Sequence, residues 1–252
     1  MPVGNAHIEL TPQLPSHNLN PQLQNKIFGA SIDSAHKQNT KGENMSGNAF
    51  ARIVQICVAG FILGGCAIGQ RFSYQSATVP MPRVASTVPV AIAVQDKRSY
   101  IVSHNKPESF VGLMRGGFGN PFDVNTTSGQ PMAIEMREAI VNSMRAKGID
   151  VKAVTVNPDD GAEKVQRALI TTGAGKLVLV TLNEWKSDTM LSTALIYDVT
   201  VLVMNEKGAE LARVRSNGRD NIGPSPHNSV PPAFSRKFEA LFDDEKIVQA
   251  LK

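Results

Sequence analysis

Cysteine is scarce in this chain of 252 residues, and its placement excludes several kinds of site. The two cysteines are Cys57 and Cys66, and both lie in or beside one apolar segment. No cysteine follows Cys66, so the rest of the chain can form no internal disulfide. A cysteine-ligated zinc site and a cysteine nucleophile are excluded from that part for the same reason.

Sequence motifs for catalysis and nucleic-acid binding are also missing. The chain has no Gly-x-Ser-x-Gly elbow and no Gly-x-x-x-x-Gly-Lys-Ser/Thr loop. After Cys66, the two histidines, His104 and His227, stand alone in predicted loops and form no pair of metal ligands. The net charge is only +4, and the basic residues are scattered. We therefore expect no enzyme, no metal or other cofactor and no nucleic-acid partner.

One apolar segment has the form of a secretory signal. Residues 53–63 are hydrophobic and uncharged, and Arg52 precedes them. A membrane-spanning helix needs about 20 apolar residues, whereas the hydrophobic part of a signal peptide needs about 7–15. The segment therefore fits a signal peptide, and a buried core helix or a signal anchor is the alternative.

The end of this segment predicts lipid attachment. Leu63, Gly64, Gly65 and Cys66 match a bacterial lipobox, in which a branched apolar residue and two small residues precede the modified cysteine. We expect cleavage between Gly65 and Cys66 and acylation of the Cys66 thiol, which would anchor the chain to a lipid bilayer. Ala67 stands where an aspartate would favour the inner membrane. We therefore expect the outer membrane, with the chain facing the periplasm.

The residues before the signal have no pattern of a folded domain. Residues 1–44 are rich in Asn, Gln, Pro and Ser, and they cannot bury enough apolar surface to offset the entropy of ordering. A chain that began at Met45 would have the short, positively charged region that normally precedes the hydrophobic part of a signal peptide, so translation is expected to begin there. The expected organisation is a disordered or untranslated extension (1–44), a lipoprotein signal peptide (45–65), a lipidated N-terminus with a flexible tether containing Pro80 and Pro82 (66–87), and a globular periplasmic domain (88–252).

Hydrophobic periodicity predicts an α/β (α+β) domain after the tether. Alternating strands and helices favour a single mixed sheet with helices packed mainly on one face, followed by a C-terminal β-meander and a helix. The prolines between 224 and 232 read as a loop. The expected strands are 88–94, 110–114, 150–156, 176–182, 193–204 and 209–216, and the expected helices are 131–148, 157 or 159 to about 172, and a last helical region over 234–251.

Five residues are candidates for binding or for an interface. Asp96 and Arg98 lie two apart just past a strand end and would project to one side, although a surface turn is the alternative. Gly116 and Gly117 could form a loop that cradles an anion, or simply a turn. Trp185 follows a buried strand, where a tryptophan is either an interface residue or a partly buried anchor.

The first strand carries Val90, Ile92, Val94, Asp96 and Arg98 in alternation. Together with the lipobox and the tether, this pattern resembles the YajG-like family of bacterial lipoproteins. The ending 244–251 is also similar, and the resemblance covers roughly residues 66–252. That family has no assigned activity, so the resemblance implies a periplasm-facing lipoprotein and no mechanism.

The sequence thus predicts a protein that acts by binding. We expect an accessory subunit of an envelope assembly, with a protein partner in the cell envelope, or a module that handles cell wall or lipid. An envelope-anchored enzyme of the hydrolase class is an alternative, because catalytic residues can be far apart in sequence. A solute-binding lipoprotein is another, although it usually needs two lobes around a cleft.

Overall fold

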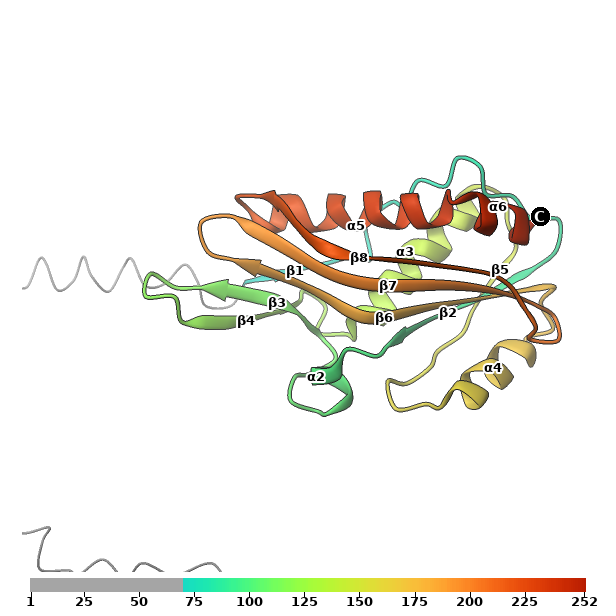
Figure 1. Cartoon of the computed structure of the whole chain (residues 1–252), viewed down its shortest axis with the longest axis horizontal. Coiled ribbons are helices and arrows are strands. Elements are labelled where there is room, and N and C mark those ends of the chain that lie inside the picture. Colours follow the sequence, from blue (N-terminus) through green and yellow to red (C-terminus); the bar gives the residue numbers. More distant parts are fainter. Residues whose placement is uncertain (1–69) are drawn as a thin grey trace, which may run out of the picture. The chain divides into compact units, whose positions relative to one another are not determined.

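A mixed eight-stranded sheet organises residues 70–252, the part of the chain that the computed structural model describes (Figure 1). Its main path has the order β1-β4-β3-β6-β2-β5, and β7 and β8 extend from β6 as an antiparallel meander. The predicted α+β fold class is confirmed. The strands are β1 (Arg71–Phe72), β2 (Val90–Asp96), β3 (Phe110–Arg115), β4 (Pro121–Thr126), β5 (Val151–Ala153), β6 (Lys176–Thr189), β7 (Thr193–Asn205) and β8 (Glu210–Gly223).

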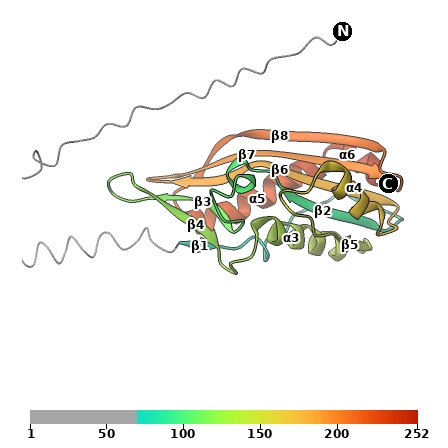
Figure 2. The same cartoon turned by 90° about the horizontal axis from the view of Figure 1, so that it is seen from below.

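Helices cover the two faces of the sheet unequally, as Figures 1 and 2 show. The larger face packs against α3, α5 and α6, and the smaller one packs against α4. The prediction of helices mainly on one face is therefore confirmed. The helices of the described part are α2 (Ser99–Val102), α3 (Met132–Ala146), α4 (Ala162–Ile170), α5 (Pro226–Phe242) and α6 (Glu245–Leu251).

The alternation in β2 explains this division. Ile92 and its alternate neighbours have large side chains and point into the core beneath α3. Ala91 and Ala93 point the other way and meet Val165 and Leu169 of α4. Successive strand residues face opposite sides of a sheet, so the small residues let α4 lie close to its face.

The strand β6 is the central element, and it is twice as long as predicted. Its first half pairs with β2 up to Leu182, and its last residues pair with β3, while β7 pairs along its other side. The continuation was missed because polar residues follow Leu182, yet Ser187 and Thr189 are buried. Gly112 of β3 is required at this crossing, since a Cβ atom there would lie 2.1 Å from the Ser187 hydroxyl oxygen.

The described part of the predicted tether is not a tether. The strand β1 pairs with β4, and the Tyr74 side chain is fully buried. The buried Glu135 carboxylate accepts hydrogen bonds from the Tyr74 backbone N–H (2.8 Å) and the Ser73 hydroxyl (3.1 Å). The predicted domain boundary at 88 is therefore wrong, and the folded domain already includes β1. Sequence analysis missed this part of the domain because its buried residues have no regular spacing. These residues are Phe72, Tyr74, Val79, Met81 and Val84. Residues 1–69, with the signal peptide and Cys66, lie outside the described residues.

Two further segments differ from the prediction. β4 was not among the predicted strands, because its sequence is polar and begins with proline. The predicted proline loop is instead the start of α5, which contains both Pro231 and Pro232. Pro226 suits the first helical position, and the buried Val230 and Phe234 hold this turn against the core even though the two prolines remove backbone donors.

The corrected boundary gives a direct test. A chain that begins at Val88 loses five buried side chains, those of Phe72, Tyr74, Val79, Met81 and Val84. At about 1.5–3 kcal/mol each, their loss is comparable to a typical domain stability of about 5–15 kcal/mol. We expect a chain from Gln70 to melt cooperatively by circular dichroism, and a chain from Val88 to show no cooperative transition. Sharp melting of both chains at similar temperatures would contradict this assignment.

Candidate functional site

The end of β2 directs neighbouring side chains to opposite sides. Asp96 and Arg98 point inward and are 2% and 0% exposed. Lys97 points the other way, and its Nζ donates to the carbonyl oxygens of Pro158 (2.7 Å) and Asp160 (3.1 Å). Asp96 and Arg98 project to one side, as expected, and they reach each other, but they form no surface turn and are too deeply buried to contact a partner directly.

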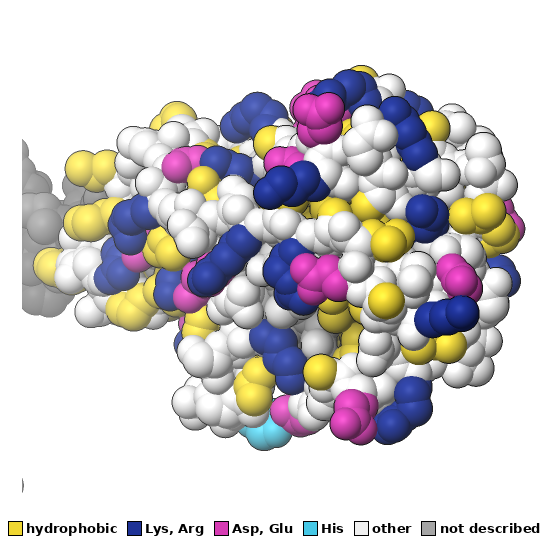
Figure 3. All heavy atoms as spheres, turned by 45° about the vertical axis from the view of Figure 1, so that its right-hand side comes forward, with side chains coloured by type: hydrophobic (Ala, Val, Ile, Leu, Met, Phe, Trp, Pro, Cys, Tyr) yellow, Lys and Arg dark blue, Asp and Glu magenta, His cyan; other side chains and the backbone are white. Residues whose placement is uncertain are grey.

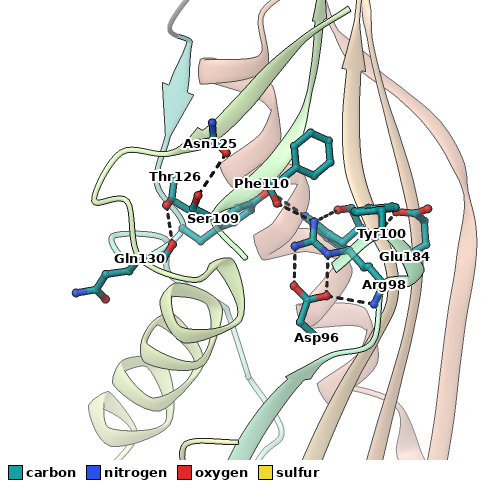
Figure 4. A network of polar contacts seen from close by, with 11 residues as sticks. Asp96, Arg98, Tyr100, Ser109, Phe110, Asn125, Thr126, Gln130 and Glu184 are labelled. Carbon is teal, nitrogen blue, oxygen red and sulfur yellow. Dashed lines mark hydrogen bonds and ion pairs between the residues drawn. The ribbon is translucent and has the colours of Figure 1, made fainter. Parts of the chain in front are cut away.

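The Arg98 guanidinium is fully engaged in hydrogen bonds (Figure 4). Its Nε and Nη2 donate to the two carboxylate oxygens of Asp96, at 2.8 and 2.6 Å. Its Nη1 donates to the carbonyl oxygens of Phe110 (2.8 Å) and Trp185 (2.9 Å). Burial acts to lower the pKa of Arg98, but the hydrogen bonds and charge of Asp96 raise it above its usual value, so Arg98 keeps its positive charge.

The position of this ion pair follows from the sheet. Along one side of β6, pairing with β2 ends at Leu182 and pairing with β3 begins at Ser187. The Trp185 carbonyl lies in the gap between them, and Arg98 supplies the donor that a strand would have supplied there. The Tyr100 ring lies 5.3 Å from the Arg98 Cζ, and its hydroxyl donates to Glu184. Asp96 and Arg98, with the Phe110 and Trp185 carbonyls, therefore hold β2, β3 and β6 together, and we call this network the joint.

Trp185 belongs to the core. Its side chain is fully buried, and its Nε1 donates to the Tyr74 hydroxyl at 2.9 Å. The indole ring also packs edge-on against Phe234 and Phe238 of α5, with centroids 6.1 and 5.7 Å away. The suggested interface role is therefore wrong, and Trp185 joins β6 to the N-terminal segment and to α5.

Gly116 and Gly117 lie in the turn between β3 and β4. The Gly116 N–H donates to the Asn120 carbonyl at 2.9 Å, and Gly117 has no heavy atom within 4 Å of where its Cβ would be. The turn leads into a strand, so no helix N-terminus is available there to hold an anion. The next residue, Phe118, is 97% exposed.

A hollow of about 610 Å³ lies beyond the carboxyl ends of the parallel strands β2 and β5, which is where open sheets commonly bind ligands. One wall is the segment from α2 to β3, and the other is the loop that follows β5. Sequence analysis missed this site because its two walls are about fifty residues apart in the chain. The lining residues are Ile101, His104, Lys106, Pro107, Glu108, Asn157, Pro158, Asp159 and Asp160.

The hollow has an acidic character. Partial burial and the charges of Asp96 and Asp159 raise the pKa of Glu108. The Asn157 backbone N–H lies 2.9 Å from the Asp160 carboxylate, and this contact, together with Lys164, lowers the pKa of Asp160. The hollow is therefore suited to a cationic or hydroxyl-bearing group.

Basic side chains at this hollow are already partnered. His104 has a left-handed backbone (φ 57°), and its Nε2 lies 3.6 Å from Asp159 at the exposed rim. The Lys106 ammonium lies 2.6 Å from both carboxylate oxygens of Asp123. None of the lining residues carries a hydroxyl or thiol nucleophile, and the described residues contain no group of three or more potential metal ligands.

Comparison with known proteins gives only remote similarities. No family model and no curated protein matches the chain. A Xanthomonas campestris protein, XCC0632 of DUF330, has a TM-score of 0.44 with 11% identity, covering 71% of this chain and 95% of its own. The PelC dodecamer from Paraburkholderia phytofirmans gives 0.37 with 12% identity, covering 67% and 91%. Lipoprotein GNA1162 from Neisseria meningitidis gives 0.30 with 13% identity, covering 61% and 94%. Within residues 70–252, no helix has the length and hydrophobicity needed to span a membrane.

The structural role of the buried ion pair predicts a large effect of a small change. Asp96→Asn leaves the buried Arg98 charge without its counter-ion, which should lower the unfolding free energy by about 3–5 kcal/mol. Asp198→Asn is the matched control, because it breaks an ion pair with Arg215, whose side chain is 57% exposed, and should therefore cost much less than the loss of the buried pair. Urea denaturation measures both variants. Equal losses in the two variants would contradict the assignment.

The raised pKa of Glu108 predicts a pH-dependent effect. The folded domain keeps the Glu108 proton to higher pH than the unfolded chain does, so its unfolding free energy falls as pH rises through that window. Glu108→Gln should therefore raise Tm slightly at pH 7 and leave it unchanged at about pH 3.5, where the carboxyl is protonated in both states. Glu206→Gln, in the exposed β7–β8 turn, is the control. A lower Tm for Glu108→Gln at pH 7 would refute this.

Proposed function

We propose that this chain is a lipid-anchored lipoprotein of the bacterial cell envelope, whose domain acts by binding as an accessory subunit of an envelope assembly. The observation that carries this proposal is where the folded domain begins. β1 starts at Arg71, five residues after the lipobox cysteine Cys66. A signal peptide that ends at Gly65 would therefore release a chain that is almost entirely folded domain.

The location of the protein rests on the sequence. Ala67 follows the modified cysteine and favours the outer membrane, with the domain in the periplasm. The strand signature from Val90 to Arg98 resembles that of the YajG-like lipoproteins, which supports the same placement.

Binding is favoured over catalysis by the chemistry of the domain. The acidic hollow offers Glu108 and Asp159 to a ligand or partner, but its lining residues include no hydroxyl or thiol nucleophile. The Asp96–Arg98 pair, whose residue types would suit an active site, is buried and holds strands together. We therefore assign the hollow as the candidate contact site for a partner in the envelope, without a reaction.

Mutation of the two cysteines tests the anchor. Cys66→Ser should abolish acylation and leave an uncleaved precursor, because the thiol is the group that is modified. Cys57→Ser is the matched control and should be processed normally, since Cys57 lies in the part that is removed. Mass spectrometry of the protein from the membrane fraction measures both. An unmodified Cys66 inside an intact peptide that also contains Gly65 would overturn the proposal.

A further inference from the structure

Three large apolar side chains are exposed at two neighbouring turns. Phe118, in the β3–β4 turn, is 97% exposed, and Leu191 and Met190, in the β6–β7 turn, are 89% and 56% exposed. A single exposed apolar side chain is ordinary on a folded domain, whereas a group of them on one surface indicates a contact with something else. We call Phe118, Met190 and Leu191 the apolar tip.

The two turns lie at the same end of the sheet. β3 and β6 are parallel neighbours, with Met114 opposite Thr189, and each turn follows directly after these residues. Figures 1 and 2 both show the β3–β4 and β6–β7 turns at the left-hand end of the described part. In Figure 3 hydrophobic side chains gather at that end, with Lys and Arg side chains beside them.

The N-terminal end of the domain points toward the same tip. β4 begins at the β3–β4 turn and runs away from it, and β1 is parallel to β4, with Arg71 opposite Asn125. The N-terminal end of β1, at Arg71, is therefore the end of that strand nearer the tip. An extended chain spans at most about 3.6 Å per residue, so Cys66 lies within about 18 Å of Arg71.

We infer that the apolar tip enters the surface of the lipid bilayer, so that the domain stands directly on the membrane in place of hanging from a tether. This inference rests on the proposed acyl anchor at Cys66, because the short distance to Arg71 leaves little room between the bilayer and the tip. Two exposed arginines, Arg71 and Arg219, lie on strands behind the tip and would face anionic headgroups.

Photo-crosslinking in intact cells tests what covers the tip. A benzophenone-bearing phenylalanine analogue replaces Phe118 or Leu191 in the full chain. The control position is Lys207, which is exposed in the β7–β8 turn at the other end of β7, on the order of 40 Å away. We expect phospholipid adducts from both tip positions and none above background from Lys207. Mass spectrometry of Cys66 in the same sample tests the anchor separately, so failure of the anchor is distinguished from failure of the tip.

A second measurement uses paired substitutions within the tip. With the analogue at Leu191, Phe118→Asp should lower the phospholipid adducts on the order of tenfold, the factor expected when one apolar side chain leaves the membrane. Phe118→Leu should keep them. Tip adducts to a protein, including a second copy of this chain, would overturn the inference, as would lipid adducts no more abundant than those at Lys207.

Discussion

The guanidinium of Arg98 supplies hydrogen bonds to backbone carbonyls of the sheet at a place where strand pairing is interrupted. β6 changes its neighbour from β2 to β3, and the change leaves the Trp185 carbonyl without a strand donor. One planar group bonds to this carbonyl, to the first carbonyl of β3 and to the Asp96 carboxylate at the end of β2. The long β6 can therefore pair with two different strands on one side without leaving the Trp185 carbonyl unpaired.

This joint also positions the surface around it. The segment that leaves Arg98 forms α2 and then the wall of the acidic hollow, while β3 continues from the same joint to the apolar tip. The hollow and the tip are thus attached to one buried ion pair, although they lie at different parts of the surface. A buried charge pair is costly to disturb, which makes it a firm support for the two surfaces that are available for contact.

The sequence predicted the elements whose hydrophobic pattern has a regular period. The strand 176–182 and the helix over 131–148 have such a pattern, and both are present, with shifted ends. Sequence reasoning failed where burial depends on distant partners. The Tyr74 ring is buried against Phe234 and Trp185, and nothing local to residues 70–87 signals those contacts. The spacing of Asp96 and Arg98 shows that their side chains project to the same side. It does not show that β3 and β6 enclose them, so both resemble surface residues in the sequence.

The way in which β1 is attached determines how the domain responds to tension. β1 is two residues long and parallel to β4, so a pull on the chain ahead of Arg71 loads their hydrogen bonds in shear, and these must break together. The next contacts to break are the hydrogen bonds that the Glu135 carboxylate accepts from the Ser73 hydroxyl and the Tyr74 backbone N–H. Beyond it lies the Tyr74 ring, bonded to Trp185 in the core. Mechanical load on the N-terminus therefore reaches the centre of the domain within four residues of Arg71.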